Sequence, residues 1–362
     1  MYSERLLKNK ILYTAAFVIA VILFLLKTFY DAGEFKTLRP HSDYRCQKIE
    51  GIPGGEDIEL DRHAGKAYIS SDSRRDGMPG GIYQYNYGSE NPELKNITGS
   101  LPFEFHPHGI SIYPKNARAA FLFAVNHRKG MQTGAAGHFI EVFSIQSDGL
   151  KHLRSVENAL LTSPNDIAAV DDEKFYVSND HGTPYVFTHR IEDYLQLSLS
   201  NIIYFDGNNF RKAADSISYA NGINLSRDQK ILYAASSVAG QIKVYDRSPA
   251  GGDLLFRENI DLNTGADNID IDEDGNLWVG CHPRLLTFVR HFKNGSVLSP
   301  SQVVKVTIEA DGRYSVKETY LNTGEDLSAS SVGAAHAGRL FIGPVFDSHI
   351  LDCRKKLDMA AE

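Results

Sequence analysis

Two features common in enzymes and nucleic-acid-binding proteins are missing from this chain of 362 residues. There is no block of basic residues and the net charge is −7, which argues against nucleic acid as a partner because phosphates would stay unneutralised. No Gly-x-Ser-x-Gly segment occurs, so the sharp turn that presents a nucleophilic serine in many hydrolases is absent. The chain instead has 30 glycines, 18 tyrosines and 19 phenylalanines, a composition that favours short strands and tight turns.

The longest apolar run lies at the N-terminus. Residues 11–26 carry no charge, and with flanking lysines they approach the roughly 20 residues that a helix needs to cross a bilayer. Arg5, Lys8 and Lys10 precede the run, so the positive-inside rule places the N-terminus in the cytoplasm. The main domain would then face the ER lumen or the cell exterior. The alternative is a signal peptide cleaved near residues 31–33, which would make the protein secreted.

Cysteines are scarce, with only three in the chain. Cys46 begins the expected globular region, Cys353 ends it, and Cys281 lies within a strand-like segment. In an oxidising compartment we expect a disulfide between Cys46 and Cys353 that leaves Cys281 free. A bridge between chain ends would close a circular array, and the chain-entropy model allows it about 4–5 kcal/mol.

Three Asn-x-Ser/Thr sequons are present. Asn96 and Asn294 lie in loop-like segments, where we expect glycosylation. Asn224 falls in a strand pattern, and we therefore expect it to be buried and unmodified.

A sixfold internal repeat determines the predicted architecture. Six segments of the form apolar, aromatic or aliphatic, apolar and small recur at intervals of 45 to 63 residues. They begin at Ala67, Phe121, Phe175, Leu232, Leu277 and Leu340. Units of about four strands repeated radially are typical of a β-propeller, so we predict an all-β fold with six blades and an N-terminal transmembrane or signal-anchor helix. Beyond residue 40, only residues 191–199 suggest a short helix.

Polar residues precede each repeated strand by 9 to 12 positions. They are Glu56-Asp57, Pro107-His108-Gly109, Asn165-Asp166, Asn221-Gly222, Asp267-Asn268 and Ser330-Ser331. Each pair alone is compatible with an ordinary turn. Because equivalent positions of a propeller converge on one end of its channel, the set predicts a ring of oxygen ligands of the kind that Ca²⁺ prefers. Zinc is disfavoured, since this ring offers one histidine and no cysteine.

Seven motifs in order resemble the serum paraoxonase/arylesterase family, over about 85% of the chain from Cys46 to Cys353. They are Gly55–Glu59, His106–Ile110, Asn126-His127, Pro164–Ile167, Ala220–Asn224, Asp267–Ile269 and Gly280–Pro283. The Asn221 segment by itself is also similar to strictosidine synthases and gluconolactonases. The resemblance implies two calcium ions in the channel and matches the expected disulfide.

The resemblance also implies a role for each site residue. A catalytic ion would be held by Glu56, Asn165, Asn221, Asp267 and Asn268. A structural ion would be held by Asp57, Asp166 and the backbone carbonyl of Ile110. His108 would activate the attacking water, His127 would support it as a relay, and His282 would line the pocket. His106 and His181 are expected to be structural or supporting.

The function implied by the resemblance is calcium-dependent hydrolysis of carboxylic esters, above all lactones and aryl esters. The alternatives are a membrane-tethered calcium-stabilised propeller that binds a partner, and a strictosidine-synthase-like propeller enzyme. The expected organisation is a tip, membrane segment and linker (residues 1–40), a propeller hydrolase domain (41–356) and a tail (357–362). Loops at residues 71–81 and 128–138 are expected at the channel mouth, where they would decide substrate fit.

Overall fold

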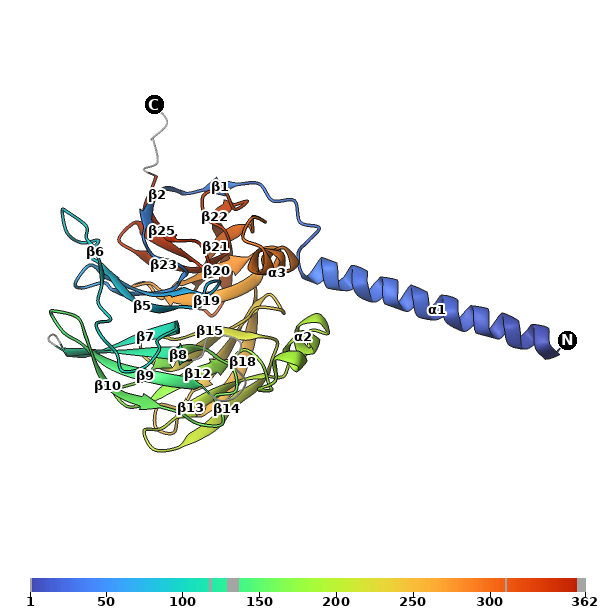
Figure 1. Cartoon of the computed structure of the whole chain (residues 1–362), viewed down its shortest axis with the longest axis horizontal. Coiled ribbons are helices and arrows are strands. Elements are labelled where there is room, and N and C mark those ends of the chain that lie inside the picture. Colours follow the sequence, from blue (N-terminus) through green and yellow to red (C-terminus); the bar gives the residue numbers. More distant parts are fainter. Residues whose placement is uncertain (1, 117–118, 129–136, 310, 357–362) are drawn as a thin grey trace, which may run out of the picture.

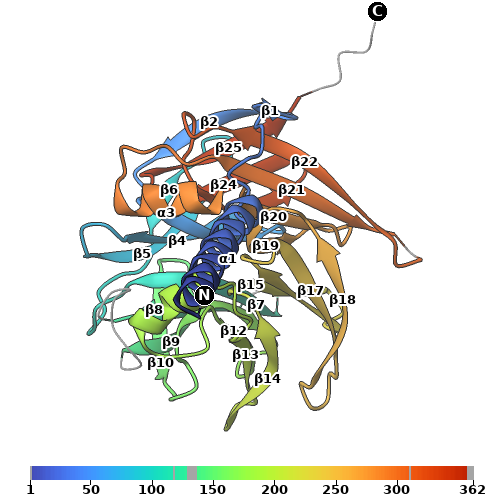
Figure 2. The same cartoon turned by 90° about the vertical axis from the view of Figure 1, so that its right-hand side faces the viewer.

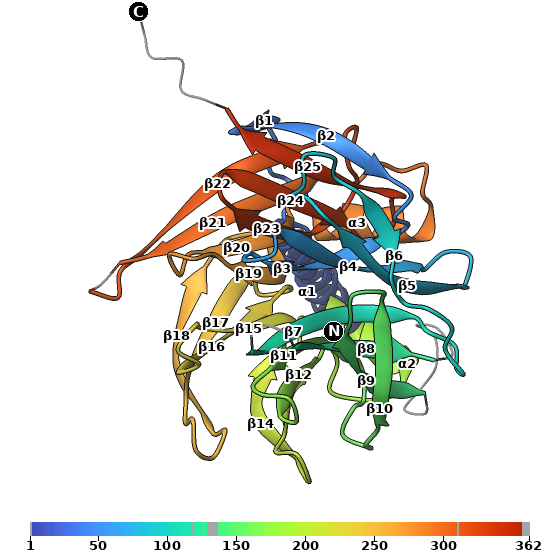
Figure 3. The same ribbon diagram turned by 90° about the vertical axis from the view of Figure 1, so that its left-hand side faces the viewer.

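A computed structural model describes residues 2–116, 119–128, 137–309 and 311–356. In these ranges six antiparallel sheets surround a common centre, and α1 (Tyr2–Asp31) projects away from them (Figures 1, 2 and 3). The predicted six-bladed propeller with an N-terminal helix is therefore confirmed. Residues 129–136 of the expected mouth loop and the tail 357–362 lie outside the described residues.

Consecutive strands along the chain build the first three blades. Blade 1 contains β3 (Gly55–Asp61), β4 (Lys66–Ser73), β5 (Met78–Tyr85) and β6 (Leu94–Asn96). Blade 2 contains β7 (Pro107–Asn116), β8 (Ala119–His127), β9 (His138–Ile145) and β10 (Leu150–Val156). Blade 3 contains β11 (Pro164–Ala169), β12 (Phe175–Asn179), β13 (Ser200–Phe205) and β14 (Phe210–Ile217).

Blade 4 is also built from consecutive strands, whereas blades 5 and 6 each add a strand from the N-terminus. Blade 4 contains β15 (Ala220–Leu225), β16 (Ile231–Ser236), β17 (Gln241–Arg247) and β18 (Leu254–Asp261). Blade 5 contains β19 (Gly265–Ile271), β20 (Leu277–His282), β21 (Ser301–Ile308), β22 (Tyr314–Asn322) and the short β1 (His41–Ser42). Blade 6 contains β23 (Ser330–His336), β24 (Arg339–Pro344), β25 (His349–Lys355) and β2 (Tyr44–Glu50).

The sixfold sequence repeat corresponds to the second strand of every blade. These strands are β4, β8, β12, β16, β20 and β24, and both of their faces are covered by neighbouring sheets. Strands buried on two faces read as continuous apolar runs, which explains the repeated pattern. The cores lie between adjacent blades, as where Ile69 of blade 1 joins a buried cluster with Phe341 of blade 6.

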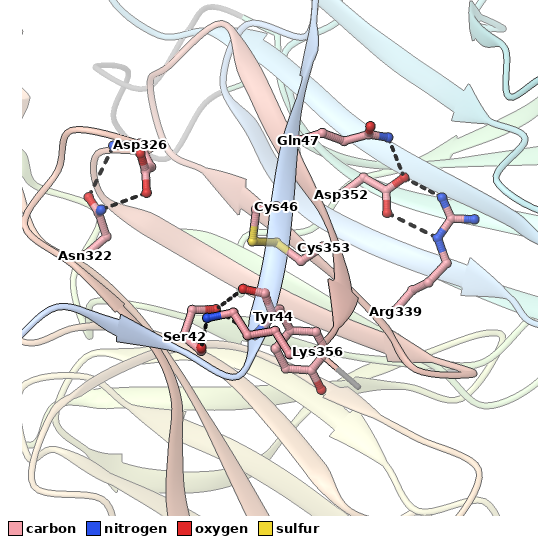
Figure 4. The surroundings of a disulfide bond; sticks show 10 residues. All are labelled: Ser42, Tyr44, Cys46, Gln47, Asn322, Asp326, Arg339, Asp352, Cys353 and Lys356. Atoms are coloured by element: carbon pink, nitrogen blue, oxygen red, sulfur yellow. Dashed lines mark hydrogen bonds and ion pairs between the residues drawn. A yellow bond between two sulfur atoms is a disulfide. The ribbon is translucent and has the colours of Figure 1, made fainter. Parts of the chain in front are cut away.

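The ring is closed by the two ends of the chain. Strand β2 pairs with β25, and the disulfide between Cys46 and Cys353 joins directly opposite residues of these strands (Figure 4). Beside it, Asp352 accepts hydrogen bonds from Arg339 (Nε–Oδ1, 3.1 Å) and Gln47 (Nε2–Oδ2, 3.4 Å). The disulfide is as predicted, and the closing strand pairing was not foreseen. Cys281 is free and buried, and burial raises the pKa of its thiol well above its usual value.

Three helices are present in the described ranges. Within α1, residues Asn9–Asp31 are long and apolar enough to cross a membrane. The other two, α2 (Val186–Tyr194) and α3 (Leu285–Lys293), lie on the same side of the propeller as α1 (Figure 1). The expected helix at residues 191–199 is therefore wrong in position, because α2 ends at Tyr194, and α3 was not predicted. Both helices are only 9 residues long, too short for a clear periodic pattern.

The three sequon asparagines differ in their exposure to solvent. Asn96 and Asn294 are exposed, as their predicted glycosylation requires, but Asn96 is the last residue of strand β6 rather than part of a loop. Asn224 is half-buried rather than buried, but both ends of its amide are engaged. Its Nδ2 donates to the carbonyl of Ile269 (2.8 Å), and its Oδ1 accepts from the amide of Leu225 (2.8 Å).

Candidate metal and catalytic site

All of the predicted polar elements lie at the beginning of an innermost strand. The strand pairing of every blade has a register shift at this point, so a β-bulge interrupts all six innermost strands at the same end of the channel. The shifts are Gly55/Asp57, Pro107/Ile110, Pro164/Ile167, Ala220/Ile223, Ala266/Ile269 and Ser330/Val332. Bulges redirect side chains away from the regular alternation, and here they fall on the residues of the predicted ring.

Two glycines of these bulges are required by close packing between blades. A Cβ added to Gly109 would lie 2.2 Å from Oδ1 of Asp166, and one added to Gly222 would lie 2.5 Å from Cα of Asn268. The His-Gly and Asn-Gly pairs are therefore not surface turns. They allow one blade to approach the polar residues of the next.

Four of the five proposed catalytic ligands have a buried side-chain oxygen that lacks a hydrogen-bond partner. This holds for Oε2 of Glu56 and for Oδ1 of Asn165, Asn221 and Asn268. Their amide nitrogens do have partners, as where Nδ2 of Asn268 donates to Oε1 of Glu56 (2.9 Å) and Nδ2 of Asn221 donates to Oγ of Ser237 (3.2 Å). Buried oxygens without a donor are costly unless a cation occupies the site, so these residues fit a hard cation such as Ca²⁺.

Asp267, the fifth proposed ligand of this ion, is paired with His282. Nε2 of His282 lies 2.7 Å from Oδ2 of Asp267, and both side chains are buried. Burial raises the pKa of Asp267, while the hydrogen bond from His282 opposes the increase. The ring of His282 stacks on Phe288 of α3, with centroids 4.0 Å apart.

The proposed structural ligands form a second group. Oδ2 of Asp57 accepts from the amide of Ile110 in the next blade (2.7 Å), and Oδ2 of Asp166 accepts from the amide of Ile223 (2.7 Å). Burial, followed by the charge of a neighbouring carboxylate, raises the pKa of both Asp57 and Asp166 well above the usual value. Carboxylates crowded in this way fit a site that a divalent cation neutralises.

Within the described ranges, no group of three or more His, Cys, Asp or Glu side chains is arranged to hold a metal ion. The proposed ligand sets are of a different kind, since three members are asparagines and one is a backbone carbonyl. Such oxygen-rich sets are typical of calcium rather than of transition metals.

His108 and His127 are in direct contact. Nδ1 of His108 lies 3.1 Å from Nε2 of His127, and Nε2 of His108 lies 3.5 Å from Oε1 of Glu56. Burial, and then the charge of His108, holds the pKa of His127 well below its usual value. The predicted pair is therefore brought together beside a proposed metal ligand, whereas His282, at the end of β20, contacts a different ligand, Asp267.

Sequence reasoning missed two side chains at this site. Arg74 is buried, with Nη2 3.7 Å from Oε2 of Glu56. Burial opposes ionisation of Glu56, but the charges of His108 and Arg74 and the hydrogen bond from Asn268 lower its pKa to about 2. The second missed residue is His138, whose Nδ1 lies 2.8 Å from Nδ1 of His127. The mouth loops expected at residues 71–81 and 128–138 contain both residues, but no sequence motif singles out either of them.

The supporting residues are close to the ring, as expected. Asp180 hydrogen-bonds to Nδ2 of Asn165 (3.4 Å) and to Nδ1 of His181 (2.6 Å). Burial opposes the charge on His181, but Asp180 and Asp193 raise its pKa to about 10. His106 contacts Asp72 (Nδ1–Oδ1, 2.9 Å) rather than any proposed ligand.

Comparison with known proteins identifies the family. A family model described as arylesterase matches residues 42–354. Serum paraoxonase/arylesterase 2 and 1 from Homo sapiens are 33% and 34% identical, each over 83% of this chain and 86% of the relative. A solved gluconolactonase from Xanthomonas campestris superposes with a TM-score of 0.54 at 14% identity, over 88% of this chain and 91% of its own, and so shares the fold. The family match and the two relatives show that this chain belongs to the arylesterase family.

Proposed function

We propose that this protein hydrolyses carboxylic esters, above all lactones and aryl esters, at a calcium site in the propeller channel. Membership of the arylesterase family makes it a hydrolase of the arylesterase and lactonase type. The observation that supports the site most strongly is the set of buried oxygens without donors on Glu56, Asn165, Asn221 and Asn268. Two ions are proposed, a catalytic one at these residues and Asp267, and a structural one at Asp57, Asp166 and the carbonyl of Ile110.

The protein groups divide the chemistry between them. When bound, calcium would polarise the substrate carbonyl and stabilise the oxyanion formed by attack. His108 accepts the proton of the attacking water at Nε2, the nitrogen that faces Glu56. His127 holds the other nitrogen of His108 and keeps the ring oriented. His282 fixes Asp267 and forms part of the pocket wall.

The membrane arrangement is a further part of the proposal. Helix α1 has the length and composition of a membrane span, and basic residues precede its apolar part. We propose that it is an uncleaved anchor with its N-terminus in the cytoplasm and the propeller, residues 41–356, in the ER lumen or outside the cell. Ala32 is buried and its carbonyl accepts from the amide of Leu285, contacts that cleavage near residues 31–33 would disrupt, and they therefore favour an uncleaved segment.

Hydrolysis of phenyl acetate and of a δ-lactone by the full-length protein tests the proposal. Chelation with EDTA is expected to abolish both activities and to lower the Tm. At a free calcium concentration of about 100 times the Kd, binding stabilises the folded state by about 2.7 kcal/mol, and chelation removes this stabilisation. Added calcium should restore both properties. Activity that survives thorough calcium removal would exclude the calcium mechanism.

Substitution of His108 tests the role of the general base independently of calcium binding. His108→Gln is expected to lower kcat by about 10²–10⁴, the usual contribution of general base catalysis, while the Tm keeps its response to calcium. A partner-binding propeller or a strictosidine-synthase-like enzyme would show no hydrolysis of either substrate. An unchanged kcat in His108→Gln would remove this residue as the base.

A further inference from the structure

A third histidine continues the pair formed by His108 and His127. Strand β8 ends at His127 and β9 begins at His138, and these two residues are directly opposite each other in the strand pairing. Opposite residues of antiparallel strands place their side chains on the same face of the sheet, close enough to touch. The two rings accordingly meet edge to face, with centroids 4.9 Å apart and an interplanar angle of 86°.

The three rings form a continuous hydrogen-bonded chain. The first contact joins Nδ1 of His108 to Nε2 of His127 (3.1 Å), and the second joins Nδ1 of His127 to Nδ1 of His138 (2.8 Å). All three side chains are buried. Both nitrogens of the middle ring are therefore engaged, so its tautomer is coupled to those of its two neighbours.

The proton positions follow from the donor and acceptor capacity of a neutral imidazole, which has one of each. For His108 to accept a proton at Nε2, its hydrogen must be on Nδ1, and Nδ1 must donate to Nε2 of His127. His127 must then carry its own hydrogen on Nδ1. That hydrogen needs an acceptor in a buried position, and the nearest is Nδ1 of His138.

We propose that His138 is a positioning residue that, as the terminal acceptor of this chain, fixes the tautomers of His127 and His108 for base catalysis. The inference rests on the proposed function, in which His108 is the base. The role is comparable to that of the carboxylate that orients the histidine of a Ser-His-Asp triad. Here the orienting acceptor is a neutral imidazole rather than a carboxylate, so it adds no charge to the pocket.

The test compares full-length variants in the presence of saturating calcium, with phenyl acetate and a δ-lactone as substrates. His138→Leu removes the acceptor, and we expect kcat to fall at least about tenfold with KM nearly unchanged. His138→Asn keeps an oxygen near the position of Nδ1 and should restore most of this loss. If His138→Leu does not fold, His138→Met is judged by the same criteria.

A double variant and a matched control separate positioning from stability. Because His138 acts through His127, the kcat of His127→Leu/His138→Leu should equal that of His127→Leu alone. His336 also has two side-chain partners, Tyr87 and Glu273, but lies at the far end of an innermost strand from the site. His336→Leu should leave kcat unchanged.

Two outcomes would overturn the inference about His138. One is an unchanged kcat in His138→Leu, and the other is an equal loss in His138→Leu and His138→Asn. His108→Gln in the same panel distinguishes this failure from failure of the proposed function. If His108→Gln loses turnover while His138→Leu does not, only the role of His138 is rejected; if His108→Gln retains it, the base itself is wrong.

Discussion

At the scale of single residues, the polar groups around the channel hold one another in defined protonation states. Asp180 contacts both Asn165, a member of the polar ring in the channel, and His181, which lies outside that ring. His181 in turn lies between Asp180 and Asp193, with Nε2 3.1 Å from Oδ1 of Asp193. A histidine enclosed by two carboxylates keeps its proton at neutral pH, and the protonated ring then holds Asp180 in place.

This arrangement predicts a loss of stability in alkaline solution. The carboxylates outweigh burial and raise the pKa of His181 from 6.5 in an unperturbed chain to about 10 in the folded protein. The folded state therefore retains a proton that the unfolded chain releases. The resulting stabilisation is fully present below pH 6.5 and is lost as the pH rises through 10.

We expect His181→Asn to lower the free energy of unfolding by about 2 kcal/mol at pH 6.5, a value reduced for screening at the exposed Asp193. The difference between wild type and variant should shrink towards pH 10. Thermal unfolding of both proteins across this pH range provides the measurement. A constant difference in Tm at every pH would show that His181 stabilises the fold without its proton.

At the scale of elements, the segment after α1 is built into the propeller through α3. The carbonyl of Ala32 accepts from the amide of Leu285 (2.9 Å), at the beginning of α3. Gly33 has a φ of +76°, and a Cβ there would lie 2.2 Å from the carbonyl oxygen of Pro283. The carboxylate of Glu34 then accepts from both the amide (2.8 Å) and the hydroxyl (2.9 Å) of Thr287.

Glu34 thus caps a helix that has no side-chain cap of its own. Glu34→Ala is expected to cost about 1 kcal/mol of stability, since the first-turn amides of α3 lose their acceptor and their favourable charge. Glu34→Gln keeps an acceptor and should cost less. Glu90, which is exposed in a loop of blade 1, gives the control Glu90→Ala. Equal Tm values for Glu34→Ala and Glu90→Ala would contradict the capping role.

At the scale of the whole molecule, the ring depends on joining its two ends. Strands β2 and β25 belong to one sheet although they are separated by nearly the entire propeller, and 307 residues separate the two cysteines. In the chain-entropy model, a cross-link that closes so long a loop strongly restricts the unfolded chain. The disulfide therefore stabilises the ring where β2, near the start of the chain, pairs with β25, near its end.

Replacing both Cys46 and Cys353 by serine should lower the stability by about 2–5 kcal/mol, the range for loss of a native disulfide. The Tm of wild type should fall on reduction, while the Tm of the double variant should not respond to the reductant. Cys281→Ala retains the bridge and serves as the control. If the double variant and wild type unfold at the same temperature, the strand pairing alone closes the ring.

Much of the fold could be predicted from the sequence because each blade of the propeller repeats one local pattern. The second strand of each blade is covered on both faces, so a short apolar run occupies part of it, and six such runs appear in the sequence. The polar ring could be predicted for the same reason, because Glu56, Asn165 and Asn221 have equivalent positions in blades 1, 3 and 4. The short helices were misplaced or missed, since 9 residues give little periodicity and their ends depend on contacts with other segments.

The sequence by itself determined the six blades, the bridge between Cys46 and Cys353, and the phase at which polar residues enter the channel. Only the tertiary structure decided which atoms face the centre, because bulges and bonds between blades set the direction of each side chain. It also brought Arg74 to Glu56 and His138 to His127. These contacts depend on hairpin register and on packing across blades, and both are long-range properties that local patterns do not encode.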